Sequence, residues 1–101
     1  GELEALHLLE AAGMDVKRND QRYIGGVENP DIALYAAGQR FHLEVKRKEK
    51  FSLYEAMDQA VADANGKAVP VVLYRKNRRP WVAILRMGDF IRLLKRSTGD
   101  C

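Results

Sequence analysis

The sequence predicts an α/β fold, in which one mixed β-sheet packs against helices in the element order αβββαββα. Three observations predict it. Residues 31–36 and 41–46 alternate like the arms of a β-hairpin, residues 53–64 carry a helical apolar stripe, and residues 69–74 form a nearly continuous apolar strand. A helix that connects two strands favours placing them parallel. The 101 residues suffice for a single domain, residues 1–101, with one core.

The first part of the chain predicts a helix, a strand and a loop. Residues 2–12 place their apolar side chains on one broad helical face, and Gly13 is expected to end that helix. Glu2 falls inside the apolar sector, which indicates either a functional partner or favourable charge at the helix N-terminus. Residues 14–18 predict a short strand, followed by a polar loop over residues 19–29.

The hairpin is the most informative element. A two-residue turn at Ala37-Gly38 pairs Ala36 with Gln39 and, counting back, Asp31 with Glu44. Directly opposed residues share a sheet face, with Cβ atoms about 4.5–5.5 Å apart. The predicted register therefore sets two carboxylates side by side, with Lys46 two residues further along the same face.

The second half of the chain predicts two helices around a strand pair. Ser52-x-x-Glu55 is a capping-box pattern that opens the helix 53–64, and Asn65-Gly66 closes it. A basic tip over residues 75–80 joins the strand 69–74 to a last strand, 81–85. A final helix over residues 88–96 is expected to turn four apolar side chains inward: Phe90, Ile91, Leu93 and Leu94.

Paired carboxylates repel one another, and the usual reasons for keeping them are a shared proton or a bound cation. Mg²⁺ prefers oxygen ligands, typically one or two carboxylates with water and substrate phosphate. A neighbouring lysine can orient a water molecule and offset charge on a phosphate. The alternative is an ordinary ion pair between Lys46 and Asp31 or Glu44 on a solvated sheet face.

Charge is unevenly distributed. Residues 1–66 hold 8 basic and 12 acidic residues, whereas residues 67–101 hold 9 basic and 2 acidic ones. A basic C-terminal third beside an acidic cluster is typical of a protein that binds a polyanion. Exposed charge that keeps the protein soluble also explains this distribution. The single cysteine, Cys101, excludes an internal disulfide and favours a reducing compartment, so we expect a cytoplasmic protein.

No apolar run is long enough to span a membrane, and the acidic first turn predicts no signal peptide. The sequence opens on Gly1 rather than Met, which is typical of a chain whose first residues have been removed.

Pro30-Asp31 followed by Glu44-Val45-Lys46, on adjacent strands after a helix bearing Glu2, resembles the PD-(D/E)xK nuclease superfamily. Within it the chain is similar to archaeal and phage-type Holliday junction resolvases and to virus-type replication-repair nuclease (VRR-NUC) domains. The resemblance implies a restriction-endonuclease-like core and Mg²⁺- or Mn²⁺-dependent hydrolysis of DNA phosphodiesters in recombination or repair. It also implies a homodimer that cuts branched DNA, leaving 5′-phosphate and 3′-hydroxyl ends, in the cytoplasm of a bacterial, archaeal or phage-infected host cell.

The same resemblance implies the roles of the site residues. Asp31, Glu44, the Val45 backbone carbonyl and Glu2 would hold the metal ion, and Lys46 would position the attacking water. Gln59 matches a glutamine often found in the replication-repair branch, although its place on the flank of the helical stripe leaves its direction open. Residues expected to bind DNA are Lys17, Arg18, Arg22, Arg47, Lys48, Gln59, Arg75, Lys76, Arg78 and Arg79.

Three hypotheses follow. The first is a structure-selective metal-dependent endonuclease acting on Holliday junctions, with flapped, nicked or plain duplex DNA as rival substrates. The second is a non-catalytic DNA-binding module on the same fold, suggested by the basic tip and by the basic helix residues Arg92, Lys95 and Arg96. The third is a structural domain in which the acidic pair and Lys46 form only a surface ion-pair cluster.

Overall fold

The computed structural model describes residues 2–19 and 31–97, without the side chains of Glu2, Asn19, Asp31 and Ser97. Asn19, predicted as the first residue of the polar loop, ends β1, and residues 20–30, with Arg22 and Pro30, lie outside the described residues. The predicted order αβββαββα is confirmed. The elements are α1 (Glu2–Ala11), β1 (Asp15–Asn19), β2 (Asp31–Ala36), β3 (Gln39–Arg47), α2 (Leu53–Ala64), β4 (Val69–Arg75), β5 (Val82–Ile84) and α3 (Met87–Ser97).

The described strands form one five-stranded sheet in the order β1-β2-β3-β4-β5. All neighbours are antiparallel except β3 and β4, which run parallel because α2 carries the chain back across the sheet between them. The predicted mixed sheet is therefore confirmed. No helix in residues 2–19 or 31–97 has the length and apolar character needed to cross a lipid bilayer.

The β2–β3 hairpin has the predicted turn and register. Ala37 and Gly38 both have positive φ, at 54° and 73°, which is the backbone of a type I′ turn matched to the twist of the flanking strands. Ala36 pairs with Gln39, and Asp31 with Glu44. A slip of one residue would have moved every side chain of β3 to the other face.

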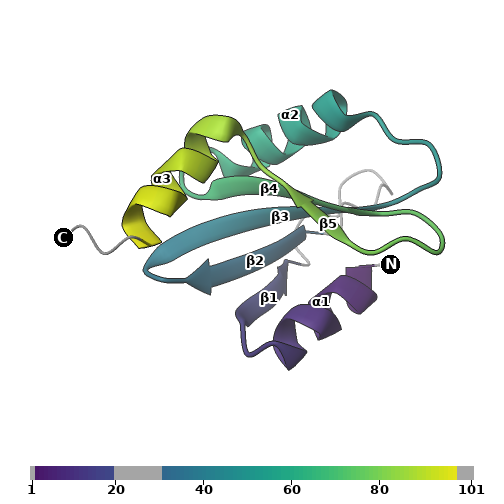
Figure 1. Cartoon of the computed structure of the whole chain (residues 1–101), viewed down its shortest axis with the longest axis horizontal. Coiled ribbons are helices and arrows are strands. Elements are labelled where there is room, and N and C mark those ends of the chain that lie inside the picture. The colour runs from purple at the N-terminus through teal and green to yellow at the C-terminus, as the bar shows by residue number, and fades with distance from the viewer. Residues whose placement is uncertain (1, 20–30, 98–101) are drawn as a thin grey trace.

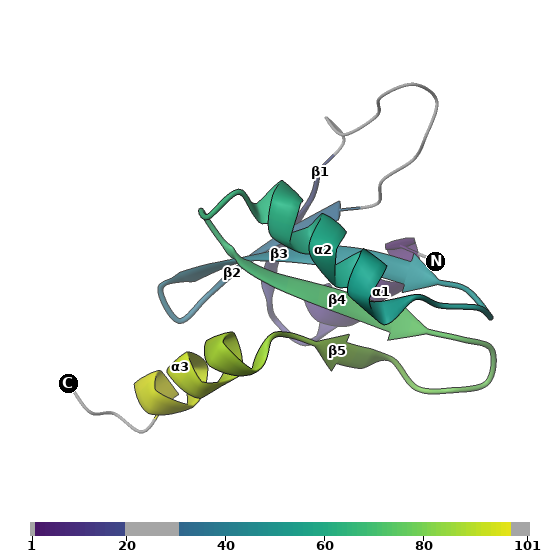
Figure 2. The same cartoon turned by 90° about the horizontal axis from the view of Figure 1, so that it is seen from above.

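Helices cover both faces of the sheet, α1 on one and α2 on the other (Figures 1 and 2). On the α1 face, Ala5 packs against a buried layer from the three central strands: Ile32, Leu43, Val45 and Val71. On the α2 face, Ala56, Met57 and Ala60 pack against Val72. The alternation of β3 thus sends its apolar side chains to the α1 core and its polar ones toward α2.

Two helix predictions are wrong. In α3, Phe90, Ile91 and Leu94 are 44–49% exposed rather than inward. The apolar period determines which side chains share a face, but α3 lies beyond the edge of the sheet, where little covers that face (Figure 1). The predicted capping box is also absent: Ser52 is the N-cap of α2, but its side chain makes no capping hydrogen bond. Asn65 ends α2 in the left-handed conformation, as expected.

Candidate metal and active site

Strand β3 brings three polar side chains to the face that α2 covers. His42, Glu44 and Lys46 alternate with Phe41, Leu43 and Val45, whose side chains belong to the opposite core. Because α2 packs over β3 and β4, Glu44, the middle residue of the three, is completely buried, at 0% exposure. A fully buried carboxylate is rare unless it is paired or binds a metal.

The two oxygens of Glu44 face different partners. Its Oε1 lies 3.4 Å from Nε2 of His42, and its Oε2 lies 3.9 Å from Nζ of Lys46. Within the described part of the chain, Oε2 is a buried atom with no hydrogen-bond partner. The carboxylate is therefore desolvated, with one long hydrogen bond to His42 at Oε1 and only the attraction of the Lys46 ammonium at Oε2.

Asp31 is the direct cross-strand partner of Glu44 in the backbone register. This is the pairing that the sequence predicted. The side chains of Asp31 and Glu2 lie outside the described residues, so their predicted places as ligands stay predictions. Val45, whose backbone carbonyl was predicted as a ligand, is buried between Glu44 and Lys46 on β3.

Lys46 is held from the helix side. Its ammonium donates a hydrogen bond of 3.3 Å to Oε1 of Gln59, in the middle of α2. The sequence left the direction of Gln59 open, and the structure turns it toward β3. Lys46 and Gln59 also line a small cavity of about 160 Å³ with Lys48 and Phe51, at the N-terminal end of α2.

Two further residues belong to this cluster, and the sequence analysis gave neither a role. Nε2 of His42 lies 4.0 Å from Oδ2 of Asp63 as well as 3.4 Å from Glu44. The alternation of residues 41–46 places His42 on the face of Glu44, whereas Asp63 was missed. The available signal was helical spacing: Asp63 is four residues after Gln59, and residues at i and i+4 share a helix face.

Next to this cluster, the sheet face beyond α2 forms a groove of about 640 Å³. His42, Asp63 and Asp15 line it together with apolar side chains and three cationic residues from different parts of the chain: Lys17, Arg40 and Lys67. Lys17 was predicted to bind DNA, whereas Arg40 and Lys67 were not singled out. The groove thus carries three cations and two carboxylates, one of which belongs to the acidic cluster.

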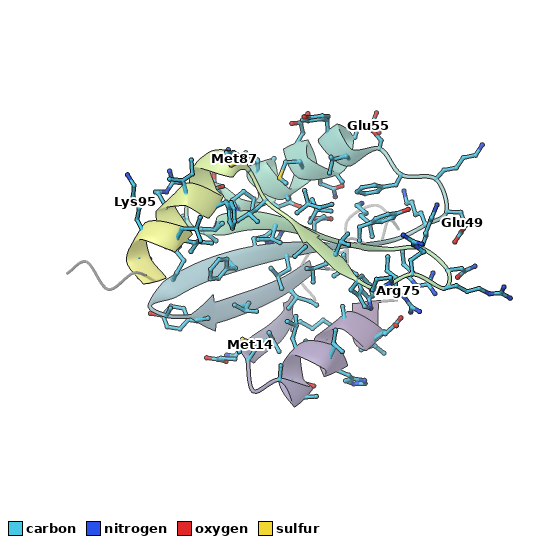
Figure 3. All side chains as sticks on the ribbon, in the orientation of Figure 1. Met14, Glu49, Glu55, Arg75, Met87 and Lys95 are labelled. Atoms are coloured by element: carbon cyan, nitrogen blue, oxygen red, sulfur yellow. The ribbon has the colours of Figure 1, made fainter. Side chains whose placement is uncertain are left out.

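The other predicted DNA-binding residues lie elsewhere. Arg47 and Arg75 are neighbours in the β3–β4 register, and both form ion pairs with Glu4 of α1, on the face opposite Glu44. Arg18 pairs with Ile32, whose side chain is in the α1 core, so it shares that face. Figure 3 shows Arg75 at the opposite end of the molecule from Lys95 of α3. Lys48, Lys76, Arg78 and Arg79 are exposed.

The chain is similar in structure to the Holliday junction resolvase Hjc of Archaeoglobus fulgidus, an archaeal hyperthermophile. The match has a TM-score of 0.64 and 24% sequence identity, and it covers 83% of this chain and 72% of that one. The likeness shows the fold: the predicted restriction-endonuclease-like core is confirmed. No protein-family model and no curated protein sequence matches the chain.

Proposed function

We propose that the protein is a metal-dependent DNA endonuclease of the PD-(D/E)xK superfamily, acting on branched DNA as a Holliday junction resolvase. One observation carries the proposal: the fully buried Glu44, with Asp31 opposite it in the register and Lys46 at 3.9 Å. The shared fold of an archaeal junction resolvase supports it.

The residues present fit a divalent cation. Oε2 of Glu44 is buried without a hydrogen bond among the described residues, as expected of an atom that awaits a ligand. Asp31, Glu44, the Val45 carbonyl and Glu2 would hold Mg²⁺ or Mn²⁺, a ligand set of hard oxygens. When bound, such an ion activates water and stabilises negative charge on the phosphate.

Lys46 supplies a fixed positive charge beside the metal ligands. Its hydrogen bond to Gln59 limits the positions that the flexible side chain can take. A lysine held in this way orients the attacking water and stabilises the charge that develops on the phosphate, without having to reorganise during the reaction. Gln59 acts through Lys46 and is a positioning residue.

The groove gives the DNA a path on the same face of the sheet as Glu44. Lys17, Arg40 and Lys67 line it, and phosphate contacts from such residues supply most sequence-independent affinity. Lys48, at the small cavity beside Lys46, extends this charge to the other end of α2. We include Lys76, Arg78 and Arg79 as exposed cations of the β4–β5 turn.

A junction has two strands to cut, so the proposed enzyme acts as a homodimer. The exposed apolar side chains of α3, among them Phe90 and Ile91, give the surface that we assign to the second copy. Flapped, nicked and linear duplex DNA are the alternative substrates.

The proposal is tested by cleavage of labelled junction, flap, nicked and linear DNAs with Mg²⁺ or Mn²⁺. Asp31→Ala, Glu44→Gln and Lys46→Ala should each lower the single-turnover rate by at least about a hundredfold, the scale of losing one charge-stabilising group. Glu10→Gln and Lys50→Ala, at exposed positions, are the matched controls. Binding without cleavage by the wild-type protein would instead support the non-catalytic module.

A further inference from the structure

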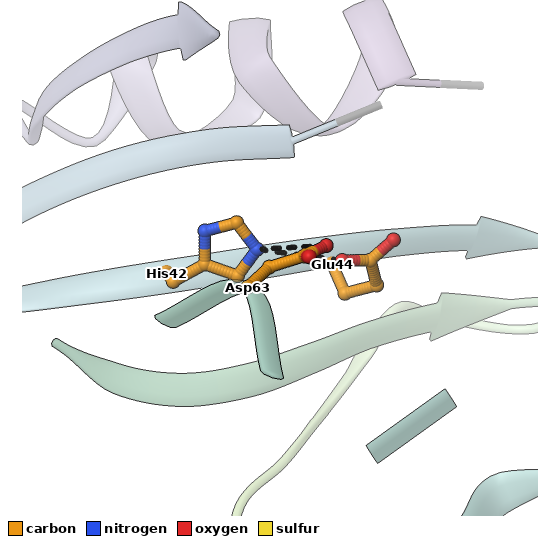
Figure 4. A group of neighbouring side chains, drawn as sticks. All are labelled: His42, Glu44 and Asp63. Carbon is orange, nitrogen blue, oxygen red and sulfur yellow. Dashed lines mark hydrogen bonds and ion pairs between the residues drawn. The ribbon is translucent and has the colours of Figure 1, made fainter. Parts of the chain in front are cut away.

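Three potential metal ligands converge on the face of the sheet that α2 covers. One ligand atom each from His42, Glu44 and Asp63 can be chosen so that all lie within 4.8 Å of one another. Figure 4 shows the His42 ring nitrogen and the two carboxylates pointing toward one another. Two of these residues, His42 and Asp63, have no part in the proposed nuclease mechanism.

His42 Nε2 and Glu44 Oε1 form a long hydrogen bond, and the spacing of the three ligand atoms also fits a shared ion. Nε2 of His42 lies 3.4 Å from Glu44 Oε1 and 4.0 Å from Asp63 Oδ2, both outside the range of about 2.7–3.2 Å of good hydrogen bonds to nitrogen donors. Two ligands about 2.1 Å from one tetrahedral metal lie about 3.4 Å apart. The three ligand atoms lie within 4.8 Å of one another, so Asp63 has to move closer to bring all three around one cation.

Burial points to the same conclusion. Glu44 is completely buried, and the side chains of His42 and Asp63 are only 11% and 18% exposed. Two carboxylates in such a dry place repel each other, and a cation between them removes that repulsion.

The fold holds the three groups from two rigid elements. His42 and Glu44 are alternate residues of β3, and Asp63 lies in the last turn of α2, which packs on that strand. Sites carried by strands and helices keep their geometry better than sites on loops. The groove that His42 and Asp63 line gives an ion access from solvent.

We propose that His42, Glu44 and Asp63 form a cation site separate from the one that contains Asp31. One imidazole and two carboxylates suit Mn²⁺ or Zn²⁺ better than Mg²⁺, because imidazole is a softer ligand than oxygen. Glu44 is shared: Oε1 faces this site and Oε2 faces Lys46. Its coupling to catalysis, through the shared carboxylate, rests on the proposed function, but the site itself does not.

The test measures Mn²⁺ uptake by the full chain in the wild-type protein and its variants. Electron paramagnetic resonance of the free ion gives the amount that remains unbound. Wild type should bind two ions per chain. His42→Gln and Asp63→Asn should each weaken one of them at least tenfold and leave the other, whereas Asp31→Asn should do the reverse. His7→Gln and Asp58→Asn replace an exposed histidine and an exposed α2 carboxylate, and should bind like wild type.

Other outcomes separate this proposal from the nuclease assignment. If the wild-type protein binds one ion per chain, and that ion is lost in His42→Gln but kept in Asp31→Asn, the result supports the new site. The same result contradicts a catalytic ion bound by Asp31. Wild-type binding in both His42→Gln and Asp63→Asn, or no uptake by the wild-type protein, overturns the new site. X-ray absorption of the Zn²⁺-loaded wild type gives a check without mutation: a shell without imidazole scattering also overturns it.

Discussion

Glu44 carries a charge into the centre of the molecule at a cost in stability. It is fully buried, and neither His42 at 3.4 Å nor Lys46 at 3.9 Å gives it a good hydrogen bond. Buried charges without full pairing are often worse for stability than neutral residues of the same size. Such sites are where a protein trades stability for function.

We therefore expect Glu44→Gln to stabilise the metal-free protein by about 1 kcal/mol, because it removes the desolvated charge while Lys46 keeps its hydrogen bond to Gln59. Urea unfolding in the presence of a chelator measures the free energy of unfolding. Glu10→Gln, at an exposed position of α1, should change it little. A loss of stability in Glu44→Gln would mean that its partners already satisfy the charge.

Gln59 tests whether the position of Lys46 matters. Gln59→Leu removes the acceptor of the Lys46 ammonium, and a hydrogen bond to a charged group contributes about 1.5 kcal/mol. The single-turnover cleavage rate should fall roughly tenfold, with little change in DNA affinity. Gln59→Glu, which keeps an acceptor, should retain more activity than Gln59→Leu. Equal rates in Gln59→Leu and wild type would remove Gln59 from the mechanism.

At the scale of the element, α3 carries polar contacts at both ends and exposed apolar side chains between them. Asp89, 3% exposed in its first turn, binds both Arg86 and Arg92. Near the C-terminal end, Arg96 donates to the Ala37 carbonyl at 2.7 Å and to Gln39 at 2.9 Å. The Asp89 ion pairs stabilise the start of the helix itself, whereas Arg96 attaches its end to the β2–β3 turn.

Asp89→Asn should lower the free energy of unfolding by about 1–2 kcal/mol, because a nearly buried carboxylate loses two arginines and its favourable place at a helix N-terminus. Urea unfolding measures this change. Hydrogen exchange should also become faster in the first turns of α3. Asp58→Asn, on the exposed face of α2, is the matched control. Unchanged stability and exchange in Asp89→Asn would show that other contacts hold α3.

The exposed face of α3 also makes the dimer testable. Ile91→Glu places a charge in that face and should convert a dimer to a monomer in analytical ultracentrifugation. Leu8→Glu changes an exposed leucine of α1, and we expect it to leave the dimer intact. If Ile91→Glu remains dimeric, another surface joins the two copies.

At the scale of the whole molecule, the sheet separates two sets of cations. Lys17, Arg40 and Lys67 line the groove on the Glu44 face, whereas Arg47 and Arg75 bind Glu4 on the other. Lys17→Ala and Arg40→Ala should each make the plot of log affinity against log salt shallower. The slope should fall in magnitude by about 1, the change expected when one phosphate contact is lost. Arg75→Ala should change it less. Fluorescence anisotropy across a salt series measures these slopes, and the reverse order would put the DNA on the α1 face.

The fold was largely predictable because its signals are local. Alternation in residues 41–46 and the Ala37-Gly38 turn determine the hairpin register, so the opposition of Asp31 and Glu44 was readable from spacing. The stripe of α2 gave its exact bounds, residues 53–64. For α3 the same kind of pattern failed, because a period says which side chains share a face and not whether anything covers it.

The sequence by itself determined the element order, the hairpin pairing and the face on which Glu44 and Lys46 lie. Tertiary structure alone decided that α2 buries Glu44 completely, that Gln59 meets Lys46, and that Asp63 approaches His42 from a helix 21 residues later in the chain. The reason is physical: register follows from bonds and turns between near neighbours, whereas burial and the meeting of distant side chains depend on how a helix docks onto the sheet.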